Sequence, residues 1–149
     1  MKKFKFRLEK VMDMRAEAER QRQMALAEAR MKVEAEEQRL QSLHETVTSE
    51  KNAIELLRTG GAIKPREINA HYQYIRRLKL DIDHQRQNIF KAKQEQELRR
   101  QELLEAAKER KMLENLKDRQ REAYMAEVNR KDQALIDDVA VTRFGKERT

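Results

Sequence analysis

Residues 59–65 read Thr-Gly-Gly-Ala-Ile-Lys-Pro, and this stretch separates two long segments that contain almost no helix breakers. The chain of 149 residues has three glycines and one proline, and the proline and two of the glycines lie here. Glycine just past a helix end supplies the left-handed cap, and proline suits the first position of the next helix. Two helices joined by a short loop become antiparallel neighbours. The stretch therefore predicts the turn of a helical hairpin.

The composition on either side of this turn excludes several classes of protein. Charged residues make up 41% of the chain, against about 25% in an ordinary globular domain. Hydrophobic residues make up 38%, and there is no cysteine, which excludes a disulfide scaffold and a large two-layer core. No apolar run approaches the roughly 20 residues of a membrane span, and no hydrophobic segment follows the basic N-terminus as in a signal peptide. A long helical protein or a disordered one remains.

Heptad periodicity decides between these two. Before the turn, helix formers dominate and one register continues without a break. Its first seam column is Met12, Glu19, Leu26, Val33, Leu40, Val47 and Ile54, and its second is Leu8, Arg15, Arg22, Ala29, Glu36, Leu43, Glu50 and Leu57. A disordered chain would not keep aliphatic residues in one column over such a length. The pattern is typical of a coiled-coil seam.

A second register follows the turn. Its columns are Ile68, Ile75, Ile82, Ile89, Gln96 and Leu103, and His71, Leu78, Gln85, Ala92, Arg99, Ala106 and Leu113. If Leu57 lies opposite Ile68, then Val47 meets Leu78 and Leu43 meets Ile82. Toward the chain ends, charged residues replace aliphatic ones in both seams. We therefore expect a well-packed tip and a looser base.

The expected fold is all-α, with two long helices in an antiparallel coiled-coil hairpin and the second helix longer than the first. We expect one elongated domain over 1–149: helix 1 at about 4–58, the turn at 59–65, helix 2 at about 66–140 and a tail at 141–149. The first helix should run out of chain opposite about Arg121. Beyond that point, a new apolar stripe has no expected partner within the chain, and it consists of Tyr124, Val128, Leu135 and Val139. An overhanging amphipathic face of this kind commonly binds another protein or a second copy.

The formal net charge of +7 is concentrated at the two chain ends. Residues 1–10 carry five basic and one acidic side chain, and 143–149 carry three basic and one acidic. A hairpin brings both ends to the same pole, where Phe4, Phe6 and Phe144 are interspersed. This pole should be attracted to an acidic surface. Its first eight residues could also bind a membrane surface peripherally, although a solvated helix start explains them equally well.

No pattern in the sequence indicates catalysis. The Gly60-Gly61 pair lacks the other elements of a phosphate-binding loop, and the three histidines share no i, i+4 spacing for a metal. Asp81 and Asp83 point to different faces of a helix, which argues against paired acid–base work. Basic and acidic residues alternate along both helices, so no nucleic acid partner is expected. We therefore predict a protein without enzymatic activity, catalytic residues, metal or cofactor.

Several stretches resemble the FliJ family of flagellar export proteins and its relatives in type III secretion. The likeness lies in Phe-Lys-Phe-Arg-Leu-Glu-Lys-Val at 4–11, the Gly60-Gly61 turn, Ile-Asn-Ala-His-Tyr-Gln-Tyr-Ile at 68–75 and Ala-Val-Thr-Arg-Phe at 140–144. It spans nearly the whole chain. The resemblance implies an antiparallel hairpin similar to the central stalk of rotary ATPases. It also implies a cytoplasmic location, peripheral at the inner membrane.

The same resemblance implies partners. In this family the terminal pole engages the hexamer of the export ATPase FliI and promotes ring formation, and the hairpin contacts the export gate FlhA; export chaperones are further partners. The candidate ATPase-binding residues are Phe4, Phe6, Arg7, Leu8, Tyr124, Val128, Leu135, Val139, Arg143 and Phe144. Aligned on the glycine pair, the candidate gate-binding residues are Gln38, Tyr74, Leu78, Asp81 and Gln85. Two alternatives stay open: a chaperone escort, and a structural coiled coil that dimerises through its C-terminal overhang.

Overall fold

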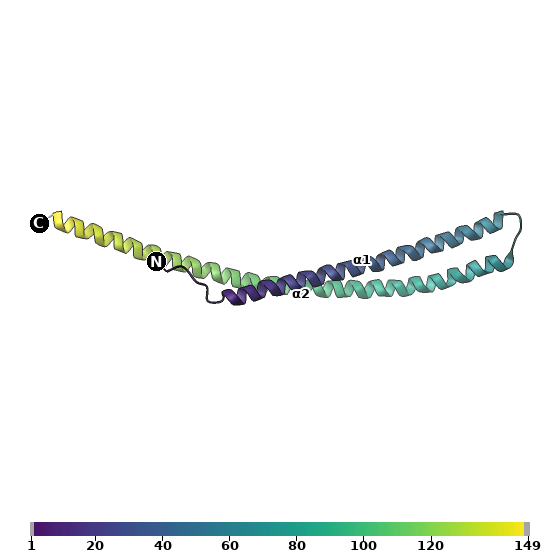
Figure 1. Cartoon of the computed structure of the whole chain (residues 1–149), viewed down its shortest axis with the longest axis horizontal. Helices are drawn as coiled ribbons and strands as arrows, with labels where there is room; N and C mark the ends of the chain where they lie inside the picture. The colour runs from purple at the N-terminus through teal and green to yellow at the C-terminus, as the bar shows by residue number, and fades with distance from the viewer. Residues whose placement is uncertain (1, 148–149) are drawn as a thin grey trace. The chain divides into compact units, whose positions relative to one another are not determined.

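The computed structural model describes residues 2–147, which form two α-helices joined by a short turn (Figure 1). Helix α1 spans Glu9–Thr59 and has 51 residues, whereas α2 spans Pro65–Glu147 and has 83. No strand occurs within 2–147. The predicted all-α hairpin with a longer second helix is therefore confirmed.

The turn depends on its two glycines and its proline. Gly61 has a φ of 82°, in the left-handed region that disfavours side chains. A Cβ at Gly60 would lie 3.1 Å from the carbonyl oxygen of Leu56, so a side chain would crowd the end of α1. Pro65 opens α2, and the Lys64 carbonyl accepts a hydrogen bond from the Ile68 amide at 3.1 Å. Both predicted roles of these residues are confirmed.

Two helix ends differ from the predicted ranges. α1 begins at Glu9 and not near residue 4, because residues 2–6 adopt no helix and 7–8 form a turn. α2 continues to Glu147, past the expected end near 140, so that 141–147 are helical and not a tail. Within this last part, the Thr142 hydroxyl donates a hydrogen bond to the Asp138 carbonyl at 2.8 Å. Gly145 alone did not end the helix.

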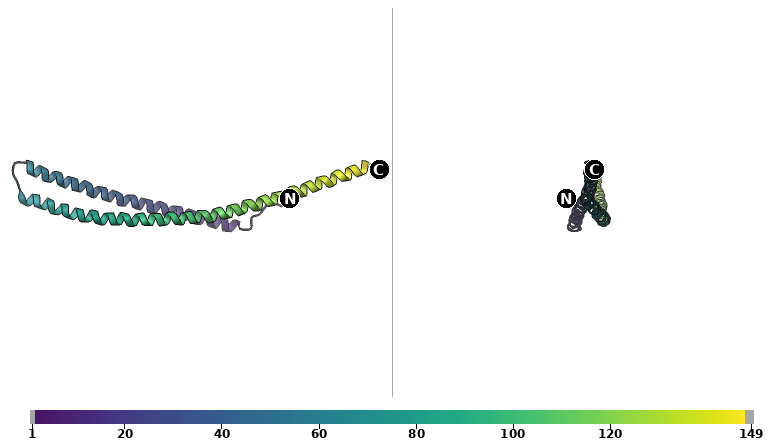
Figure 2. Two further views of the ribbon diagram at one scale, coloured as in Figure 1. Left: turned by 180° about the vertical axis from the view of Figure 1, so that it is seen from behind. Right: turned by 90° about the vertical axis from the view of Figure 1, so that its right-hand side faces the viewer.

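Contacts group the residues into two units. The tip unit is Gln21–Leu104, and the base unit consists of Met1–Arg20 and Glu105–Thr149. In the tip unit, α1 and α2 lie side by side and antiparallel (Figures 1 and 2). The buried residues of the tip unit all belong to the predicted seam columns: Leu26, Ala29, Val33, Val47, Ile54, Ile75, Leu78, Ile82, Gln85, Ile89 and Ala92. Val47, Leu78 and Ile82 cluster, with Leu40 and Leu43 packed against them, which confirms the predicted register.

Polar seam positions of the tip unit are paired across the helices. Gln85 is buried, and its side-chain amide donates hydrogen bonds to the Glu36 carbonyl at 2.9 Å and to the Glu36 carboxylate. His71 pairs through Nδ1 with the Glu50 carboxylate. Within 2–147, no buried side-chain nitrogen or oxygen lacks a hydrogen-bond partner. Satisfied polar layers of this kind fix the register of a coiled coil.

Candidate docking surface in the base unit

The seam of the base unit is built from ion pairs. Arg15 contacts Glu109 at 2.7 Å, Glu9 contacts Lys117 at 2.9 Å, and Glu19 pairs with Arg110. Hydrogen bonds to Glu19, and then to Glu114, raise the pKa of Arg110. These side chains are partly exposed, and a surface ion pair of this kind contributes little net stability. Phe6 is the one buried residue of the described part of the base unit.

Residues 2–8, which we call the strap, lie before α1 in a non-helical conformation (Figure 2). Burial alternates along the strap: Phe6 is buried and Phe4 and Leu8 are half-buried, whereas the intervening Lys5 and Arg7 are exposed. Successive side chains of an extended chain point to opposite sides, so this alternation defines an apolar face and a basic face. The strap thus turns its aromatic residues inward and its positive charges toward solvent.

Tyr124 of α2 receives the strap. The rings of Phe4 and Tyr124 lie 5.6 Å apart between centroids and are tilted by 43°. The Tyr124 hydroxyl donates a hydrogen bond to the Lys2 carbonyl. The expectation that the apolar stripe has no partner within the chain is therefore wrong at its first residue.

The strap is held by few contacts. An aromatic pair contributes about 0.5–1.5 kcal/mol, and burial of a phenylalanine such as Phe6 contributes about 1.5–3 kcal/mol. Fixing the backbone of the strap costs conformational entropy, which opposes these contacts. The Glu9 amide donates to the Phe6 carbonyl at 3.2 Å, which anchors the strap to the start of α1. The remaining strap residues are attached to α2 with little net stability.

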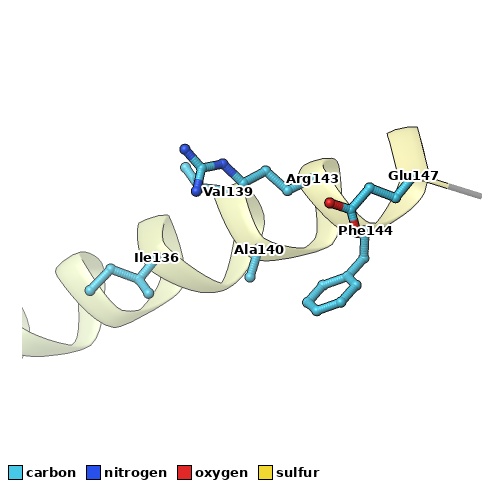
Figure 3. A pocket seen from close by; sticks show the side chains of 6 residues that line it. All are labelled: Ile136, Val139, Ala140, Arg143, Phe144 and Glu147. Carbon is cyan, nitrogen blue, oxygen red and sulfur yellow. The ribbon is translucent and has the colours of Figure 1, made fainter.

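Beyond the strap, α2 presents exposed apolar residues on one side of the helix, which we call the stripe: Leu135, Ile136 and Val139. One groove of about 390 Å³ is lined by Ile136, Val139, Ala140, Arg143, Phe144 and Glu147. Figure 3 shows Ala140 and Phe144 projecting from the same side of the helix, with Arg143 beside Val139. A second groove runs from the strap into the stripe, and it is lined by Lys2, Tyr124, Glu127, Val128, Lys131, Asp132 and Leu135. The strap and the stripe therefore form one continuous surface.

The candidate ATPase-binding residues divide into two groups on this surface. Phe4, Phe6, Leu8, Tyr124 and Val128 are half-buried or buried and belong to the strap or to the part of α2 that adjoins it. Arg7, Leu135, Val139, Arg143 and Phe144 are exposed. All ten lie in the base unit, where apolar side chains alternate with basic ones. The surface suits a partner with an apolar strip and acidic flanks.

The candidate gate-binding residues lie in the tip unit. Gln38, Tyr74 and Asp81 are exposed, whereas Leu78 is 4% exposed and Gln85 is 6% exposed. Leu78 packs in the core and Gln85 bonds to Glu36, so neither can touch a partner while the helices are closed. The accessible part of this face is therefore narrower than the resemblance implied. Asp81 also lines a groove together with Arg39 and His84.

The strap was missed at the level of sequence. Phe-Lys-Phe-Arg-Leu at 4–8 alternates apolar and basic residues with a period of two, which is typical of an extended segment with one buried face. The heptad register was nevertheless continued through these residues, since Leu8 also fits a seam column. The period-two signal could have placed the start of α1 after Leu8.

Comparison with known proteins identifies the family. The family model described as Flagellar FliJ protein matches residues 4–149. The chain belongs to the FliJ family. It is therefore a component of flagellar protein export. No curated protein and no solved structure matches the chain. Neither helix, within 2–147, has a stretch long and apolar enough to cross a membrane.

Proposed function

We propose that this FliJ-family chain is a non-enzymatic coupling component of the export apparatus. Its base unit binds the ring of the export ATPase FliI, and its tip unit contacts the export gate FlhA. It works in the cytoplasm, peripherally at the inner membrane. The exposed stripe carries this proposal, because Leu135, Ile136 and Val139 form an apolar helix face that the described chain leaves open.

The stripe can act by differential binding alone. A protein that contacts one conformation of an ATPase subunit more favourably than another shifts the population toward it. An amphipathic helix docks through residues spaced by three or four positions, as Leu135 and Val139 are. Ring assembly is then promoted by the same contacts, since a bound helix stabilises the assembled state by mass action.

A pair of valines on α2 tests the docking of the ATPase. Val139 is 51% exposed on the stripe, and Val141, two residues later on the opposite side of the helix, is 71% exposed. Val139→Asp places a charge in the proposed apolar contact and should weaken binding to the purified ATPase by about tenfold or more, which is about 1.4 kcal/mol. Stimulation of ATP hydrolysis should fall in parallel.

Val141→Asp is the matched control, because it makes the same change to charge and helix propensity away from the stripe. It should bind the ATPase like the unaltered chain. Equal effects of the two variants would contradict docking through the stripe. Deletion of the residues after Arg121 should abolish stimulation altogether.

A pair of tyrosines tests the contact with the gate. Tyr74 and Tyr72 are 41% and 42% exposed, and the Tyr72 hydroxyl accepts a hydrogen bond from Arg58 at 3.0 Å. Tyr74→Ala should weaken binding to the cytoplasmic part of FlhA by about tenfold and leave the melting temperature unchanged. Tyr72→Ala should lower the melting temperature slightly and keep binding. Normal binding by the Tyr74 variant would remove this residue from the gate-binding face.

The same open stripe also supports the alternative of a dimerising coiled coil. Two copies could cover each other's apolar faces. Sedimentation separates the two functions. A molecular mass that stays monomeric at every concentration supports the coupling component, and a stable dimer that Val139→Asp dissociates supports the alternative.

A further inference from the structure

We infer that the strap is a displaceable ligand of a peptide-binding site on α2, and that the docking partner takes over this site when it binds. The site is the surface around Tyr124 and Val128. Its ligand class is an extended segment with aromatic side chains at alternate positions, and the chain's own residues 2–8 now fill it. The inference rests on the proposed docking of the ATPase at the base unit.

The strap carries its aromatic side chains at alternate positions. Phe4 lies against the ring of Tyr124, and Phe6, two residues later, is buried. Lys5 between them is exposed. The site also contacts the backbone of the strap, since the Tyr124 hydroxyl donates a hydrogen bond to the Lys2 carbonyl, a group that every peptide has. These are the features of a site for an extended peptide.

The position of the site shows what displacement would achieve. Tyr124, Val128 and Leu135 line one groove together with Lys2 of the strap. The strap therefore occupies the N-terminal end of the surface whose C-terminal end is the exposed stripe. Its release would extend the open apolar face from Leu135 back to Tyr124. An extended segment of the ATPase that follows α2 would compete with the strap for these residues.

The strap is also weakly attached to α2. It ends in a turn at 7–8, and Lys5 and Arg7 on its basic face are exposed. A non-helical segment with few buried contacts opens more readily than the helices beside it.

The first experiment measures the strap in the chain alone. Trypsin needs a flexible segment to cleave quickly, so release of the strap should raise the cleavage rate after Arg7, which mass spectrometry follows. Phe4→Ser should raise this rate at least about threefold, because it removes the ring contact. Lys5→Ser is the matched control on the exposed face and should leave the rate unchanged. Equal rates in the two variants would overturn the peptide site.

The second experiment measures exchange with the partner. A chain that lacks residues 2–6 should bind the purified export ATPase about threefold to tenfold more tightly, because no strap has to be displaced. ATPase added to the full chain should accelerate cleavage after Arg7. A synthetic peptide of residues 1–8 should compete with the ATPase for the shortened chain, and its Phe4→Ser version should not.

Weaker binding by the shortened chain, or protection of Arg7 by the ATPase, would overturn the inference and make the strap part of the docking surface. The proposed function fails in a different way. In that case the ATPase binds neither the full nor the shortened chain, while the cleavage rates of the isolated chain still decide whether the peptide site exists.

Discussion

The tip unit and the base unit use the same two helices in different ways. In the tip unit, aliphatic side chains such as Val47, Leu78 and Ile82 are buried between α1 and α2. In the base unit, charged residues occupy several of the equivalent seam positions, and Glu19 meets Arg110 where the tip would place two aliphatic side chains. One heptad register therefore supports two kinds of interface.

The two kinds of interface suggest that the tip unit provides stability and the base unit provides binding surfaces. Burial of an aliphatic side chain contributes about 1.5–3 kcal/mol, whereas an exposed ion pair contributes about 0–1 kcal/mol and weakens in salt. The tip unit is therefore expected to hold the hairpin closed. The base unit can open or exchange contacts at low cost, and it is also the unit that carries the strap and the open stripe.

The largest expected effect comes from removing a core leucine of the tip unit. Leu78→Ala should lower the free energy of unfolding by about 2–5 kcal/mol, because it leaves a cavity in the Val47–Ile82 cluster. Leu135→Ala, at a residue that is 64% exposed, should change it by less than about 0.5 kcal/mol. Denaturation by urea, followed by circular dichroism, measures both. Similar losses of unfolding free energy in the two variants would contradict the conclusion that the tip unit, and not the base unit, stabilises the hairpin.

Periodicity predicted the tip unit well because its fold depends on local spacing. Each aliphatic column in the sequence became a buried column, and the Gly60-Gly61-Pro65 pattern fixed the turn. The polar partners of Gln85 and His71 did not follow from spacing alone. They depend on which Glu of α1 lies opposite each of them, and therefore on side-chain geometry.

The base unit was predicted less well because its structure depends on a contact between distant parts of the chain. Helix propensity near residue 4 does not reveal that Phe4 gains more from the ring of Tyr124 than from another turn of α1. The gate-binding residues carried over by resemblance were also predicted less well. The alignment could not show that Leu78 is buried in the core, whereas its position in the seam column indicated this.

A smaller effect should appear in the ionic seam of the base unit. Arg110→Gln removes the pairs with Glu19 and Glu114 and should destabilise the seam locally, by much less than the loss of a core aliphatic side chain. Hydrogen exchange should then become faster at amides near 15–20 and 106–114, and remain unchanged near Val47. In 1 M salt, where charges are screened beyond about 3 Å, the difference between the variant and the unaltered chain should shrink. A salt-independent difference would indicate packing by the Arg110 stem, not its charge.

The smallest effect concerns a single exposed pair in the tip unit. Arg100 donates to both Glu97 carboxylate oxygens, at 2.9 and 2.6 Å, and these hydrogen bonds, together with its charge, lower the pKa of Glu97 from its usual range. A folded pKa below the unfolded value gives stability that is present above the unfolded pKa and is lost as the pH falls through the folded pKa. Arg100→Gln should therefore raise the titration midpoint of the Glu97 carboxyl carbon, measured by NMR. Arg76→Gln, which removes a charge elsewhere on α2, should not. Identical titration midpoints of Glu97 in the unaltered chain and the Arg100 variant would contradict the role of Arg100. Because both partners are exposed, the pair should leave the pH dependence of unfolding almost unchanged. This result is expected if the aliphatic seam, and not the charged faces, stabilises the tip unit.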